Sequence, residues 1–146
     1  MPAFEINFFT QSVNVSLRNR KNLKECLIRL INLENKFIRT AGVNVIFCDD
    51  PYLYELNTKF LKHNTLTDII TFSYSSGNDL KGDIFISIDR VKENAKMYAQ
   101  LYRNELLRVI IHGFLHLSGY DDKNSKEKEI MTQKENFYLE FLKNND

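Results

Sequence analysis

Two of the three histidines in the chain, His112 and His116, lie four residues apart in the segment V-I-I-H-G-F-L-H-L-S-G-Y-D-D. A separation of four residues is about one helical turn, so both imidazoles would project from the same face of a helix. Two imidazole nitrogens on adjacent turns could bind one tetrahedral Zn²⁺ at about 2.0–2.1 Å each. The spacing alone also fits two ordinary core histidines, so the surroundings must decide between these interpretations.

The surroundings of the two histidines favour a metal site. Apolar residues cover nearly every side of the segment, which predicts a central buried helix, and buried imidazoles need polar partners. Gly119 is expected to end this helix, because glycine is the usual residue just past a helix end. The chain then turns through two carboxylates that could supply a third ligand, Asp121 and Asp122.

The string H-G-F-L-H-L-S-G-Y-D-D resembles the H-G-x-L-H-L-x-G-Y-D-H signature of the YbeY family, the bacterial endoribonucleases of rRNA maturation. Only the last position departs from that signature: Asp122 stands where the family has its third metal-binding histidine. A carboxylate oxygen is a competent zinc ligand. The resemblance therefore implies one Zn²⁺ per chain, held by His112, His116 and Asp122, with Asp121 as the alternative third ligand.

Two further stretches carry the same resemblance. Residues 56–60 are similar to the family's L-N-x-x-Y/F segment, and residues 67–72 to its T-D/N-x-x-S/T-F strand. The arginine that the family commonly places after the aromatic residue is Leu61 here, followed by Lys62 and His63. A lysine ammonium is a mobile point charge and not a bidentate phosphate clamp. Lys62 and His63 are candidate catalytic residues, and the alternative interpretation is an exposed polar loop.

A strand at residues 82–87, G-D-I-F-I-S, is similar to the family's G-D-I-x-I-S strand, which borders the metal cleft. Asp83 in this strand is either a turn residue or a catalytic residue, and the former interpretation is favoured. The absence of a glutamate after the first histidine argues against a zinc peptidase, because H-E-x-x-H enzymes carry their general base where this chain has Gly113.

A basic helix face is expected in the first third of the chain, on a helix that begins near Ser16. Its ordinary interpretation is a solvated helix face, and the alternative is a patch that contacts RNA phosphates without reading sequence. For that alternative we expect contributions from Arg18 and Lys21, together with Lys59 and Lys62. Basic residues outnumber acidic ones on the predicted face: Arg18, Arg20, Lys21, Lys24, Arg29, Lys36 and Arg39.

Size and composition predict a single cytoplasmic domain spanning residues 1–146. This length suffices for one substantial core, and the net charge of +1 gives no overall attraction to nucleic acid. Cys26 and Cys48 lie in apolar surroundings without a C-x-x-C pattern, which indicates buried thiols. No run approaches the roughly 18 apolar residues that a membrane span requires, and the start lacks a signal-peptide pattern. We expect a monomer that does not bind membranes.

Hydrophobic periodicity predicts about four strands and about five helices, which together form an α+β domain. The resemblance adds a small mixed sheet with the metal-binding helix packed on one face. Helix caps are expected at Ser16, at Asp49 or Asp50, and at Asp89. The expected strands cover residues 4–9, 43–48, 69–74 and 82–87. The expected helices cover residues 16–38, 52–61, 90–102, 105–118 and a final segment from 123.

Two functions of different classes are consistent with these residues. The resemblance implies a single-strand-specific, metal-dependent endoribonuclease that acts in 16S rRNA 3′-end maturation and ribosome quality control. Its partners would be single-stranded rRNA, the 30S subunit or its proteins, and an Era-type GTPase. The alternative is a non-catalytic ribosome-assembly factor with a structural zinc. Leu61 favours the alternative, whereas a three-ligand site favours the enzyme, because structural zinc is almost always held by four protein ligands.

The aspartate ligand predicts an altered pH dependence of zinc binding. A carboxylate is protonated at lower pH than an imidazole, so protons should compete less with the metal at this position. We expect wild-type protein to keep zinc at about pH 5 better than the Asp122→His variant does. Zinc content after equilibration across a pH series measures this difference, and tighter retention by the histidine variant would contradict it.

Overall fold

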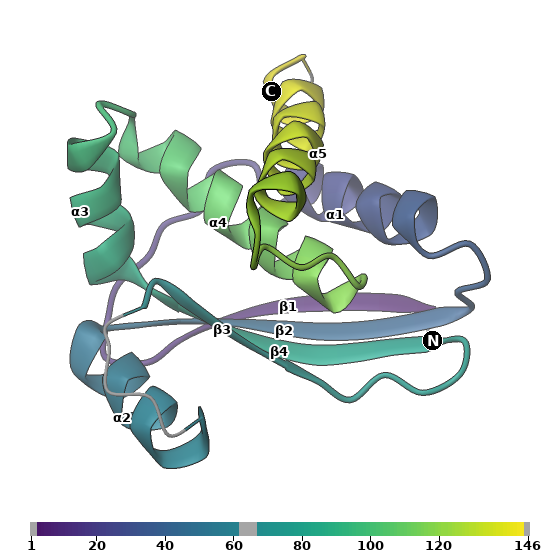
Figure 1. Cartoon of the computed structure of the whole chain (residues 1–146), viewed down its shortest axis with the longest axis horizontal. Helices are drawn as coiled ribbons and strands as arrows, with labels where there is room; N and C mark the ends of the chain where they lie inside the picture. The colour runs from purple at the N-terminus through teal and green to yellow at the C-terminus, as the bar shows by residue number, and fades with distance from the viewer. Residues whose placement is uncertain (1–2, 62–66, 145–146) are drawn as a thin grey trace.

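A computed structural model describes residues 3–61 and 67–144 and contains one mixed sheet of four strands with five helices, which confirms the α+β prediction (Figure 1). The strands are β1 (Phe4–Thr10), β2 (Thr40–Cys48), β3 (Ile69–Ser73) and β4 (Asp79–Ser87). The helices are α1 (Arg20–Glu34), α2 (Asp50–Leu61), α3 (Ile88–Met97), α4 (Tyr102–Leu117) and α5 (Ser125–Asn144).

The sheet has the strand order β1-β2-β4-β3, in which the first three strands are parallel and β3 is antiparallel to β4. Alternate residues of each strand face opposite sides. In β4, Gly82 and Ile84 face α4, and Asp83 therefore points to the other face. There its carboxylate accepts hydrogen bonds from the Asn44 amide at 3.1 Å and the Tyr74 hydroxyl at 3.2 Å. This placement favours a structural role for Asp83.

The helices divide unequally between the two faces of the sheet. Figure 1 shows α1, α4 and α5 above one face and α2 below the other. The main core lies between the sheet and the upper helices, and a smaller cluster of Cys48, Leu53 and Ile70 lies between the sheet and α2. Both cysteines are buried free thiols, as predicted, and burial raises the pKa of each to about 12. Among the described residues, no helix has the length and apolar character needed to cross a bilayer.

Two glycines allow α4 to lie close against β3 and β4. A Cβ atom at Gly113 of α4 would come within 2.9 Å of side-chain atoms of both Ile69 and Ile84. A Cβ atom at Gly82 would lie 2.6 Å from the Leu117 side chain and 2.8 Å from the Phe72 carbonyl oxygen. Because Gly113 directly follows His112, this close contact with the sheet fixes the part of α4 that carries the histidines.

The predicted start and end of the first helix are wrong. The helix α1 begins at Arg20, and its N-cap is Asn19, whose side chain accepts a hydrogen bond from the Asn22 amide, so Ser16 lies outside. Asparagine caps helices as well as serine does, and here it lies nearer to the apolar stripe. The helix ends at Glu34, short of the predicted residue 38, and Phe37 beyond it is 75% exposed.

The helix predicted over residues 90–102 corresponds to α3, which ends at Met97, and α4 begins at Tyr102 instead of the predicted Glu105. Ser87, not Asp89, caps α3 by accepting a hydrogen bond from the Arg90 amide at 3.3 Å, while Asp89 accepts from the Asp50 amide at 2.8 Å. The left-handed residue Ala99 (φ 52°) lies in the turn that separates the two helices.

Gly113→Ala should destabilise the protein even though alanine is the better helix former. The added methyl group would overlap Ile69 and Ile84, so we expect the free energy of unfolding to fall by about 1–2 kcal/mol. Urea denaturation of the metal-free protein measures this change in the free energy of unfolding. Gly42→Ala is the matched control, because nothing lies within 4 Å of its added atom. Equal effects of the two substitutions would contradict this account of how α4 packs.

Candidate metal centre

The last turns of α4 and the segment after it bring the predicted metal ligands together. His112 and His116 project from the same face of the helix, and Gly119, with φ +103°, ends it as predicted. The amide of Tyr120 donates to the Leu115 carbonyl at 3.1 Å, which turns the chain back toward the helix. Asp122 therefore lies beside the two imidazoles.

The three donor atoms have the separation that a tetrahedral metal requires. The Nε2 atoms of His112 and His116 are 2.9 Å apart, and Asp122 Oδ2 lies 3.3 Å and 3.6 Å from them, respectively. Ligands bound to zinc at about 2.0–2.1 Å in a tetrahedron lie roughly 3.3 Å apart. Asp121 is exposed and is not part of this cluster. The arrangement of the three residues therefore fits a metal cofactor.

The outer nitrogens of both imidazoles are held by hydrogen-bond acceptors. Nδ1 of His116 lies 2.9 Å from the backbone carbonyl oxygen of Tyr120, and Nδ1 of His112 lies 2.6 Å from a carboxylate oxygen of Glu135. Because a carbonyl and a carboxylate only accept, each Nδ1 donates a proton outward, and each Nε2 faces inward, where its lone pair can bind a cation when the ring is neutral. Such outer partners orient metal-binding histidines in general. Two lone pairs and a carboxylate thus converge where a cation would bind.

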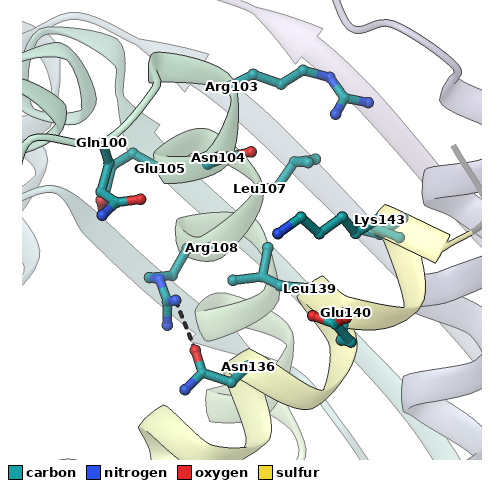
Figure 2. A pocket seen from close by; sticks show the side chains of 11 residues that line it. Gln100, Arg103, Asn104, Glu105, Leu107, Arg108, Asn136, Leu139, Glu140 and Lys143 are labelled. Atoms are coloured by element: carbon teal, nitrogen blue, oxygen red, sulfur yellow. Dashed lines mark hydrogen bonds between the residues drawn. The ribbon is translucent and has the colours of Figure 1, made fainter.

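The carboxylate that holds His112 is fixed by its own partners. Glu135 of α5 is buried, and its second oxygen accepts from the Arg108 guanidinium at 2.8 Å. Figure 2 shows the Arg108 side chain reaching from α4 to Asn136 on α5, where the bond to the amide oxygen is also 2.8 Å. The guanidinium borders a cavity of about 310 Å³ between the two helices, so water can reach Arg108 from that side. A pair of helices thus holds the outer side of the His112 ring.

The electrostatics of the site favour positive charge. Burial lowers the pKa of His112, but the hydrogen bond to Glu135 and the surrounding carboxylates outweigh burial and hold this pKa above its ordinary value. Burial raises the pKa of Asp68, whose carboxyl group interacts with His112 and with Asp122. Burial likewise raises the pKa of Glu105, against the opposing charge of Arg108. Acidic groups around the imidazoles therefore attract a cation.

The sequence analysis missed the groups that support the histidines. Glu135 lies four residues after Met131 and three before Tyr138, both buried, so it belongs to the inward stripe of α5. A carboxylate in an apolar stripe is the signal that could have identified it, because buried acids are nearly always paired. The same reasoning applies to Glu105 on α4, which is buried as well.

Three other predicted site residues, Arg18, Lys21 and Lys59, do not gather at this cluster. Lys62 and His63 lie outside the described residues. Exposed Lys21 belongs to α1 above the sheet, with exposed Arg18 two residues before that helix, whereas exposed Lys59 belongs to α2 below the sheet (Figure 1). The structure therefore does not bring these three cations into one patch. Part of the basic face covers the core, since the Arg20 and Lys24 side chains lie over the Phe8 ring, 5.8 Å and 5.9 Å from its centroid.

The Glu135→Gln substitution should weaken metal binding without removing a ligand. The variant loses the negative charge that polarises the His112 ring and the ion pair with Arg108, and losses of this kind cost about 10–100-fold in metal affinity. Competition with a chromophoric chelator measures the change. Glu140→Gln is the control, because it removes one charge from an exposed position of the same helix. An equal loss in both variants would indicate that only long-range charge matters.

Comparisons with known proteins place the chain in a family. A sequence model described as "Endoribonuclease YbeY" matches residues 5–143. Proteins of that name from Karelsulcia muelleri and Cytophaga hutchinsonii are 46% and 45% identical to it, each over 94% of this chain and 96% of its own length. The solution structure of a Thermotoga maritima protein aligns with a TM-score of 0.61 and 30% identity, covering 94% of this chain and 89% of that one. This chain therefore belongs to the endoribonuclease YbeY family.

Proposed function

We propose that this chain, a hydrolytic endoribonuclease of the YbeY family, is a metal-dependent enzyme that cuts single-stranded rRNA in 16S 3′-end maturation and ribosome quality control. The proposed catalytic domain spans residues 1–146. The observation that carries the proposal is the convergence of His112, His116 and Asp122. Three protein ligands are typical of catalytic zinc sites, whereas structural sites are closed by four. Among the described residues no fourth ligand joins this cluster.

Zn²⁺ is the proposed metal, because a donor set of two imidazoles and one carboxylate is common in catalytic zinc sites. When bound, it would supply Lewis acidity to a phosphodiester oxygen. The side chains around it have separate tasks: Glu135 orients one imidazole, and the buried Asp68 carboxyl, whose pKa is raised, is a candidate to hold or pass on a proton. A peptidase is disfavoured, because Gly113 packs against isoleucines where such enzymes carry their base.

Lys62 and His63 are the proposed contacts to the substrate phosphate. They follow Leu61, which replaces the arginine of the family pattern and is itself 42% exposed at the end of α2. Lys59, Arg18 and Lys21 are proposed only as peripheral contacts to the RNA backbone. The proposed partners are the 30S subunit or its proteins and an Era-type GTPase. We propose that the protein acts on them as a cytoplasmic monomer.

A second candidate function is a non-catalytic assembly factor that binds rRNA or small-subunit proteins around a structural zinc. The observation that favours it is Leu61, because an apolar side chain cannot clamp a phosphate. This candidate predicts metal binding without RNA cleavage.

The decisive measurement is cleavage of a labelled single-stranded rRNA 3′ fragment by wild type and His116→Ala, purified side by side with metal content determined. We expect wild type to hold about one zinc and cut, and His116→Ala to do neither, because it lacks one of the three ligands. Asp121→Asn is the matched control, since this neighbouring carboxylate lies outside the cluster and should be dispensable. If wild type holds zinc but cuts no more than His116→Ala, the assembly-factor function is supported, and binding to 30S subunits would be measured next.

A further inference from the structure

We propose that Glu34, the last residue of α1, is a positioning residue of the metal centre, which it reaches through Tyr120. The proposal rests on the metal site described above. The carboxylate of Glu34 would anchor the Tyr120 hydroxyl, and the backbone carbonyl of Tyr120 would in turn fix the ring of His116. Glu34 belongs to a different helix from the ligands and is not a ligand itself.

The Glu34 carboxylate lies at the junction of three segments. It accepts hydrogen bonds from the Tyr120 hydroxyl at 2.5 Å, from the Tyr138 hydroxyl at 2.5 Å and from the Lys134 ammonium at 3.2 Å. Its side chain is only 6% exposed. Burial alone would raise its pKa, but these hydrogen bonds outweigh burial and hold the pKa below its ordinary value. The carboxylate therefore stays ionised and forms charge-assisted hydrogen bonds, which are stronger than neutral ones.

Tyr120 connects this carboxylate to the metal ligands through both its side chain and its backbone. Its hydroxyl binds Glu34, while its carbonyl oxygen lies 2.9 Å from His116 Nδ1. It also stands between Gly119, whose φ of +103° is accessible mainly to glycine, and Asp122, the third candidate ligand. Backbone hydrogen bonds from Gly119 and Tyr120 to the last turn of α4 close this turn, and the phenol held by Glu34 adds a side-chain anchor beyond the glycine.

Two tyrosine hydroxyls donate to the Glu34 carboxylate, so the effects of removing each of them can be compared directly. Tyr138 is fully buried in α5 and its hydroxyl donates to Glu34, whereas Tyr120 not only donates to Glu34 but also contacts His116 through its carbonyl oxygen. Loss of either hydroxyl removes one hydrogen bond from the same carboxylate. A merely structural role of Glu34 would make the two losses equivalent at the metal, and a positioning role would make them different.

The experiment compares Tyr120→Phe with Tyr138→Phe, using Zn²⁺ affinity and the visible absorption spectrum of the Co²⁺-substituted protein, which reports coordination geometry. We expect Tyr120→Phe to weaken affinity by about 10-fold or more and to shift the Co²⁺ bands. Tyr138→Phe should lower the melting temperature but leave affinity and spectrum as in wild type. Glu34→Gln, whose amide oxygen can still accept one hydroxyl, should give an intermediate loss. Equal affinities and spectra in the two phenylalanine variants would overturn the proposal.

A measurement on the metal-free protein separates this proposal from the metal site itself. Nitrogen-15 shifts of the His116 ring report whether Nδ1 carries the proton, as its bond to the Tyr120 carbonyl requires. We expect that tautomer in wild type and in Tyr138→Phe, and a mixture of tautomers in Tyr120→Phe. If wild type bound no metal but the tautomers differed in this way, positioning by Glu34 would stand and the proposed metal-dependent function would fall. If metal bound but neither readout distinguished the variants, the proposed role of Glu34 would fall and the proposed metal-dependent function would stand.

Discussion

When both rings are neutral with the proton on Nδ1, two imidazole Nε2 atoms 2.9 Å apart repel each other unless a cation lies between or beside them. The repulsion follows from the outer partners, because the Glu135 carboxylate and the Tyr120 carbonyl each draw the ring proton to Nδ1. The carboxylate of Asp122 adds a negative charge at 3.3 Å and 3.6 Å from the same two nitrogens. The fold therefore holds three electron-pair donors together in an arrangement that binding of a cation, a metal or a proton, would stabilise.

Holding such donors in place requires rigid support from several elements, and each histidine is supported by a different one. His112 is oriented from α5, through Glu135, and His116 by the turn whose Tyr120 hydroxyl is bound to Glu34 of α1. The helix that carries both rings is in turn pressed onto β3 and β4, because Gly113 lets it approach closer than any side chain would. Helices that contribute no ligand thus determine where the ligands are. Through Glu135, α5 therefore belongs to the candidate site although none of the three candidate ligands lies on it.

Which features of the site and fold could be predicted from the sequence depends on how far apart in the chain the interacting residues lie. The histidine pair and a nearby carboxylate were predictable, because four-residue spacing and a glycine-ended helix are local features, whereas the choice of Asp122 over Asp121 came from the family resemblance. Glu135 lies 23 residues from His112, and no local pattern pairs them, although a carboxylate in a buried stripe was a usable signal. The cap predicted for α3 failed for another reason, because Ser87 and Asp89 are both good caps and tertiary contacts choose between them, whereas Asp49 caps α2 as predicted by accepting from the Tyr52 amide at 3.0 Å. The strand order, which connects residues far apart in the chain, followed from neither kind of pattern.

The two departures from the family pattern act in the same electrostatic direction. Asp122 in place of a histidine adds one negative charge to the candidate ligand set, and Leu61 in place of an arginine removes one positive charge from the end of α2. A carboxylate among its ligands would make a bound metal less electrophilic than three imidazoles would. If the chain binds a phosphodiester as proposed, cations other than an arginine at position 61 must supply the compensating positive charge, and Lys62 is the nearest of them in sequence.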